Sequence, residues 1–142
     1  MKKSVFTLCI FALFCFLSSC DKDDECSCSK EIYGKWEAEE FMSVESVLYA
    51  KNDDYNPTIE FMHDGTYNLR LDANGCSGSF ELEESNSITV SGAGCTEICC
   101  DSDFSIKFAS TLPQVSTYEI DADELKLNVP GWGWIELERV SD

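Results

Sequence analysis

Residues 58–82 read TIEFMHDGTYNLRLDANGCSGSFEL, and this stretch decides the fold. Apolar and polar residues alternate along it, most clearly from Tyr67 to Leu71, which is the pattern of a strand with one buried face. Two turn signals, His63-Asp64-Gly65 and Asp72-Ala73-Asn74-Gly75, interrupt the alternation, and the Asp-Gly pair suits the positive φ angles of a tight hairpin. The stretch therefore predicts consecutive antiparallel strands.

The same alternation extends to both sides. Strands are predicted at residues 35–42, 58–62, 66–71, 76–82, 88–91, 115–120, 125–129 and 132–140, and residues 44–49 continue the first strand or form another. One segment changes period, because Phe104, Phe108 and Leu112 recur at i, i+4 and i+8. This predicts a helix over about residues 102–112, with Asp101 or Ser102 as its N-cap. The expected fold is mainly β, a small antiparallel barrel or half-barrel with one helix and disulfide staples.

The N-terminus has the pattern of an export signal. Lys2 and Lys3 precede an apolar run of 13 residues, Val5 to Leu17, which is shorter than the roughly 20 residues of a membrane-spanning helix. The run ends in Leu17-Ser18-Ser19-Cys20, which resembles the bacterial lipobox. The resemblance implies that residues 1–19 are a lipoprotein signal peptide and that the cysteine, once lipidated, is the contact with the membrane.

The residues after Cys20 indicate where in the cell the protein is expected. Lys22-Asp23-Asp24-Glu25 resembles the surface-export tag of lipoproteins in certain Gram-negative lineages, which implies an outer-membrane lipoprotein at the cell surface. The alternative is the periplasmic face of the outer membrane, with the acidic run as a solvated linker. Residues 20–32 are then the acylated cysteine and its tether, and residues 33–142 form one β domain.

The charge balance excludes some partners. Without Lys2 and Lys3, 8 basic residues stand against 27 acidic ones, a net charge of −19. Such a surface repels nucleic acid and anionic lipid headgroups, so neither is expected as a direct partner.

The nine cysteines divide by position. Cys9 and Cys15 leave with the signal peptide, and Cys20 takes the lipid. An even remainder in an exported domain indicates disulfides, and the count alone leaves their pairing open. A metal cluster is the alternative, disfavoured by the lack of a Cys-x2-Cys pair and by the single histidine. The remaining six are Cys26, Cys28, Cys76, Cys95, Cys99 and Cys100.

Catalytic patterns are absent from the sequence. His63, the one histidine, sits beside an Asp-Gly turn, where we expect it to be solvated. No Gly-x-Ser-x-Gly elbow, His-x-x-x-His pair or phosphate-binding glycine loop occurs. The acidic loop pairs do not follow calcium-loop spacing; they are Asp53-Asp54, Asp101-x-Asp103 and Asp121-x-Asp123-Glu124. We expect a non-enzyme with neither cofactor nor metal.

Trp132-Gly133-Trp134 is the most prominent apolar feature near the C-terminus. Alternation places both indoles on one face of the last predicted strand, opposite Ile135 and Leu137, which are the better core candidates. The indole face is either core or a platform for a sugar, peptide or partner protein, and both interpretations stand.

Several short motifs occur in a recognisable order, namely Gly75-Cys76, Gly78-Ser79-Phe80, Thr96-x-Ile98-x-Cys100, Ser116-Thr117-Tyr118-Glu119-Ile120 and Leu125-Lys126-Leu127. Together they resemble the META domain, the HslJ-like family of small envelope proteins, over about residues 34–140. The Gly-x-Trp start and the Phe-x-x-Asp-Gly-Thr-Tyr hairpin are also similar to lipocalin-like lipoprotein domains. Ser77, Ile98, Cys95 and Cys99 depart from the META pattern.

The resemblance implies a disulfide between Cys76 and Cys100. Cys95 and Cys99 are then expected to pair with Cys26 and Cys28. These motifs are mostly turns and core positions, so they support a fold better than an activity. The functional expectation is a non-catalytic structural or binding module; the alternative is an inhibitor of a hydrolase, such as a lysozyme or protease, or a small-ligand binder.

Overall fold

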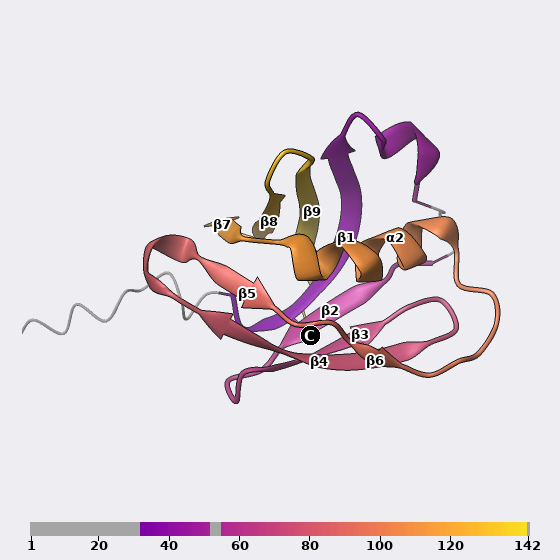
Figure 1. Ribbon diagram of the computed structural model, residues 1–142, viewed down its shortest axis with the longest axis horizontal. Coiled ribbons are helices and arrows are strands. Elements are labelled where there is room, and N and C mark those ends of the chain that lie inside the picture. Colours follow the sequence, from indigo (N-terminus) through magenta and orange to yellow (C-terminus); the bar gives the residue numbers. More distant parts are fainter. Residues whose placement is uncertain (1–31, 52–54, 142) are drawn as a thin grey trace, which may run out of the picture.

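In the computed structural model, which describes residues 32–51 and 55–141, one antiparallel sheet runs in the order β5-β4-β3-β2-β1-β9-β8-β7, with β6 paired to β4 beside this path (Figure 1). The two edges of the sheet approach each other. Ser87 forms a bridge with Thr117, and the Ile88 N–H donates to the Ser116 carbonyl at 3.0 Å. The sheet therefore curls into a nearly closed barrel, which confirms the expected fold class.

The eight strands predicted outside residues 44–49 are all present. The strands are β1 (Gly34–Ser43), β2 (Thr58–Phe61), β3 (Thr66–Arg70), β4 (Gly75–Leu82), β5 (Ile88–Val90), β6 (Gly94–Cys95), β7 (Thr117–Asp121), β8 (Glu124–Val129) and β9 (Gly133–Arg139). The helices are η1 (Ser46–Leu48), η2 (Glu84–Asn86), α2 (Asp103–Thr111) and η3 (Leu112–Gln114). The sequence pattern does not predict β6, because a strand of two residues is too short to show an alternation.

The strand expected at residues 44–49 is absent, and the 3-10 turn η1 takes its place. The Leu48 N–H donates to the Glu45 carbonyl at 2.9 Å, which closes the turn. Val44, Val47 and Leu48 follow the spacing of a helical turn (i, i+3, i+4) and not the spacing of a strand.

The predicted helix is confirmed as α2. Ser102 is its N-cap, accepting a hydrogen bond from the Ser105 N–H at 3.2 Å. Phe104 and Phe108 are buried, and the Phe104 ring stacks on Phe41 of β1 with centroids 4.6 Å apart. In Figure 1 the helix crosses between β1 and the lower strands β2–β6. Within the described residues, no helix has the length and apolarity that crossing a bilayer requires.

Alternate residues of the strands point inward and form one core. Trp36 is fully buried, and its indole N–H donates to the Ile32 carbonyl at 2.7 Å. Tyr67 lies across Gly78 so closely that a Cβ there would meet its ring at 2.6 Å. The Tyr67 hydroxyl donates to the Ser91 carbonyl at 2.6 Å, which ties β3 to the end of β5.

Candidate binding surface

An exposed apolar surface lies where β1 ends. Val44, Val47 and Leu48 are 95%, 84% and 68% exposed, and Met42 is 37% exposed. We call these four residues, together with Trp134, the apolar surface. Large aliphatic side chains close together in solvent are typical of interaction sites. Strand alternation does not reveal this surface, whereas the helical spacing within residues 44–48 could have done so.

The segment that carries Val44, Val47 and Leu48 is held in place by contacts with α2 and with Trp132. The Lys107 ammonium on α2 contacts the Glu45 carboxylate at 2.9 Å, and the Trp132 indole N–H donates to the same carboxylate at 2.9 Å. The ammonium also lies over the rings of Tyr49 and Trp132, 4.9 and 5.1 Å from their centroids. Polar and aromatic groups therefore anchor η1 while its aliphatic groups face solvent.

This anchor depends on an ionised Glu45. The hydrogen bond from Trp132 and then the hydrogen bond and charge of Lys107 hold the pKa of Glu45 below its usual value. The carboxylate thus remains charged at any ordinary pH, and the contacts that position η1 persist with it.

The two indoles of the Trp132-Gly133-Trp134 motif do not share a face, which corrects the expectation from alternation. Trp132 precedes β9 and packs against the core, edge-on to Phe41 at 5.8 Å. Gly133 has a φ of +140°, so the alternation of β9 begins only after it. Trp134 is opposite Met42 of β1 and Asn128 of β8.

Both indoles nevertheless line one open hollow of about 630 Å³. The other lining residues are Glu40, Phe41, Met42, Ser43, Val44 and Ser46. Ile135 and Leu137, between the outward residues of β9, are fully buried, which confirms their assignment to the core.

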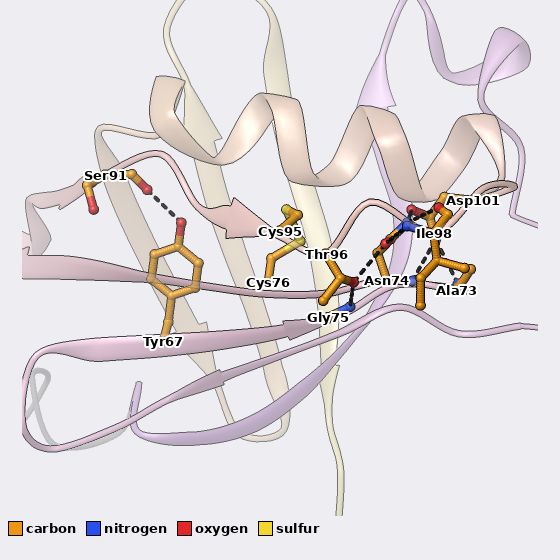
Figure 2. Close-up of a disulfide and its surroundings, with 10 residues drawn as sticks. All are labelled: Tyr67, Ala73, Asn74, Gly75, Cys76, Ser91, Cys95, Thr96, Ile98 and Asp101. Atoms are coloured by element: carbon orange, nitrogen blue, oxygen red, sulfur yellow. Dashed lines mark hydrogen bonds between the residues drawn. A yellow bond between two sulfur atoms is a disulfide. The ribbon is translucent and has the colours of Figure 1, made fainter.

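The disulfide joins Cys76 to Cys95 and not to Cys100, which corrects the expected pairing (Figure 2). The cause is strand register, because β6 pairs with β4 and places Cys95 directly opposite Cys76. This bond also rules out the expected pairing of Cys95 with Cys26 or Cys28. Cys99 and Cys100 are exposed and form no disulfide among the described residues. A hydrogen bond with Cys99, followed by desolvation and the charge of Asp101, raises the pKa of the Cys100 thiol.

A polar network holds the loop that follows β6 (Figure 2). The buried Asn74 side chain donates to the Ile98 carbonyl at 2.7 Å and accepts from the Ile98 N–H at 2.8 Å. Asp101 accepts hydrogen bonds from the Ala73 N–H at 2.7 Å and from the Asn74 amide at 2.6 Å. Burial alone would raise the pKa of Asp101, but these bonds outweigh it and the pKa is lowered. Asp101 therefore acts as a loop anchor and not as the helix cap.

The remaining candidates show no catalytic arrangement. His63 is exposed and its ring lies 4.0 Å from that of Tyr33. No three His, Cys, Asp or Glu side chains between residues 32 and 141, apart from the undescribed 52–54, are grouped to hold a metal. Several predicted sites lie outside the described residues, namely Cys20, the tag Lys22-Asp23-Asp24-Glu25, Cys26, Cys28, Asp53 and Asp54.

Comparison with known proteins identifies the family. The META domain family model matches residues 30–134, most of the barrel and its helix. The chain belongs to the META domain family. This confirms the resemblance seen in the Gly75-Cys76 and Thr96-x-Ile98-x-Cys100 segments. No sequence among curated proteins matches this META domain protein.

Two solved structures share the fold of this META domain. A DUF4847 family protein from Bacteroides vulgatus is similar with a TM-score of 0.61 and 16% identity, over 80% of this chain and 99% of that one. A protein from Burkholderia xenovorans, solved by NMR, is similar with a TM-score of 0.64 and 12% identity, over 81% and 88% of the two chains. At such identities the similarity extends to the fold alone, and neither protein's name indicates a catalytic role.

Proposed function

We propose that this META domain protein is a non-catalytic, lipid-anchored module of the outer membrane that is displayed at the cell surface and binds a partner through the apolar surface. The observation that carries the proposal is the exposure of Val44, Val47 and Leu48 on a segment that the rest of the fold holds in place. In a mobile loop, such side chains could turn away from water part of the time. An anchored segment keeps the three aliphatic side chains exposed to water, which costs hydrophobic free energy for as long as no partner covers them.

Anchoring also favours binding energetically. A partner that docks on a preorganised segment does not need to order it, so less of the contact energy is lost to conformational entropy. The Lys107–Glu45–Trp132 contacts provide this order before any partner arrives.

The position of the apolar surface suits a tethered protein. The tether enters the domain before Gly34, at the start of β1, and the apolar surface lies around Met42 to Leu48, at the other end of this strand of 10 residues. At about 3.3 Å per residue the two ends lie roughly 30 Å apart. A lipid on Cys20 would thus attach the domain through the end of β1 that is opposite the apolar surface.

The anchor is tested by lipid labelling. Cells that make the full chain and are fed labelled palmitate should yield a labelled protein, and Cys20→Ala should abolish the label while a Cys15→Ala control retains it. Replacing Lys22-Asp23-Asp24-Glu25 by Ser and Asn should remove the protein from protease attack on intact cells. A labelled Cys20→Ala variant would refute lipidation at this residue.

The binding role is tested in the same cells by a photo-crosslinking residue at position 47. We expect a discrete adduct that is lost when Leu48→Ser is added, and no adduct from a crosslinker at Ser77, an exposed position on β4. Equal adducts from positions 47 and 77 would refute a specific role for the apolar surface.

A hydrolase inhibitor is the second candidate, and the net charge of −19 without Lys2 and Lys3 favours a basic enzyme as its target. The full chain should then slow a basic lysozyme at low salt, and the slowing should fade as salt is added.

A further inference from the structure

The outward face of the barrel differs between its two halves. On β2, β3 and β4 the outward positions form cross-strand rows that are mostly neutral, such as Glu60–Asn68–Ser77 and Thr58–Arg70–Gly75. Here hydroxyl and amide groups prevail, and Arg70 and Glu60 balance each other in charge.

On β1, β9, β8 and β7 the outward positions carry the acid, and we call this the acidic face. One row across these four strands is Glu37–Glu138–Glu124–Asp121, and the next is Glu40–Glu136–Lys126–Glu119. A bulge after Ala38 adds Glu39 beside them.

Many of these carboxylates stand directly opposite one another. Glu37 faces Glu138 and Glu40 faces Glu136 between β1 and β9. Like charges in such cross-strand positions are destabilising. Lys51 relieves part of the repulsion at Glu37 and Glu39, at 3.2 and 2.9 Å, and Lys126 reaches Glu124 at 2.7 Å. Lys126 also stands opposite Glu136 and attracts it electrostatically. The ion pairs among the described residues do not include Glu40 or Glu138.

The acidic face continues into the apolar surface. The row after Glu40–Glu136 is Met42–Trp134, so an apolar pair directly follows an acidic pair along β1 and β9. Glu40 also lines the hollow between the two indoles. The two features are therefore parts of one outward sheet surface.

We propose that this continuous surface docks a cationic polypeptide, whose Lys or Arg side chains meet the acidic face while a neighbouring aliphatic or aromatic side chain packs on Met42 and Trp134. The inference rests on the proposed binding role and names the chemistry of the partner. Charge complementarity selects this occupant, because a second copy of the chain would oppose acid to acid. Glu40 and Glu138, which take part in none of the ion pairs among the described residues, gain most from such a partner.

The test is a titration of the full chain, purified in a non-ionic detergent, with a synthetic peptide of alternating lysine and leucine at low salt. Glu40→Gln/Glu136→Gln/Glu138→Gln should weaken binding by about tenfold, given the usual strength of exposed ion pairs. The matched control Glu81→Gln/Glu83→Gln/Glu84→Gln removes as many exposed carboxylates near the end of β4 and should leave affinity within about twofold.

Two further peptides separate the contributions. A lysine–serine peptide should bind more weakly and respond to the glutamate variant but not to Trp134→Ser. A glutamate–leucine peptide should not bind. Amide NMR shifts on adding the lysine–leucine peptide should fall on β1, β8 and β9 and leave β2–β4 unmoved.

Three results would overturn the inference. Equal weakening of peptide binding by the two triple variants would mean that only the net charge matters. Tight binding of the glutamate–leucine peptide would exclude a preference for a cationic partner. A failure of both lysine peptides to bind would also exclude a cationic partner. If the position-47 adduct in cells still depends on Leu48 in any of these cases, the binding module survives and only the partner chemistry falls.

Discussion

The two halves of the barrel bury the same kind of core, but one exposes mostly neutral side chains and the other exposes carboxylates. The β2–β4 half carries the features that hold the fold together, namely the Cys76–Cys95 bond, the Asn74 network and the Tyr67–Ser91 contact. The half made by β1, β9, β8 and β7 carries facing glutamates and the exposed aliphatic residues next to them. Both halves contribute to the core, but the first adds these covalent and polar ties, while the second retains unfavourable groups on its surface, which is the pattern expected of a binding face.

The largest effect is expected at the disulfide of the β2–β4 half. Cys76→Ser/Cys95→Ser should lower the free energy of unfolding by about 3 kcal/mol, because the bond closes a loop of this length in the unfolded chain. Urea denaturation measures the loss. Cys99→Ser/Cys100→Ser is the matched control and should leave the urea midpoint nearly unchanged. A large loss of stability in the single variant Cys100→Ser would instead support a bond between Cys76 and Cys100.

The next effect is expected where Tyr67 covers Gly78. Gly78→Ala should cost about 1–3 kcal/mol, since the added Cβ would meet the tyrosine ring. Gly94→Ala is the control, because a Cβ at this position would have nothing within 4 Å. Thermal unfolding compares the two, and equal melting temperatures would show that the ring moves aside freely.

A smaller effect of opposite sign is expected on the acidic face. Glu138→Gln removes a charge that stands opposite both Glu37 and Glu124, so it should raise the free energy of unfolding by about 0.5 kcal/mol. Glu81→Gln, opposite Thr89, should change it less. Denaturation at low salt is the measurement. A destabilised Glu138→Gln variant would mean that the facing carboxylates do not repel each other.

The smallest effect concerns acid pH at the apolar surface. Because the folded pKa of Glu45 is depressed, its contribution is present above the ordinary glutamate pKa and is lost as pH falls through the folded value. Tryptophan fluorescence should therefore change in this acid range as Trp132 loses its acceptor. Glu45→Gln should remove this transition, and an unaltered transition would assign it to another carboxylate.

Local sequence patterns predicted much of this molecule. Alternation located eight strands, the i, i+4, i+8 phenylalanine and leucine spacing located α2, and short motifs indicated the META family. These predictions succeed because a strand or helix buries one face, and the residues of that face recur at short, regular spacings in the sequence. The prediction for residues 44–49 was wrong because it continued the alternation of the preceding strand, whereas Val44, Val47 and Leu48 have the spacing of a helical turn.

What only the tertiary structure decided is which distant residues become neighbours. The pairing of β6 with β4 selected Cys95 over Cys100 as the partner of Cys76, although both cysteines were visible in the sequence. The pairing of β1 with β9 brought Glu40 beside Glu136 and Met42 beside Trp134. The sequence by itself determined the faces of the elements and the excess of acid, whereas strand register brought carboxylates from β1, β7, β8 and β9 opposite one another. The physical reason is that strand register depends on contacts across the whole barrel, which no local window contains.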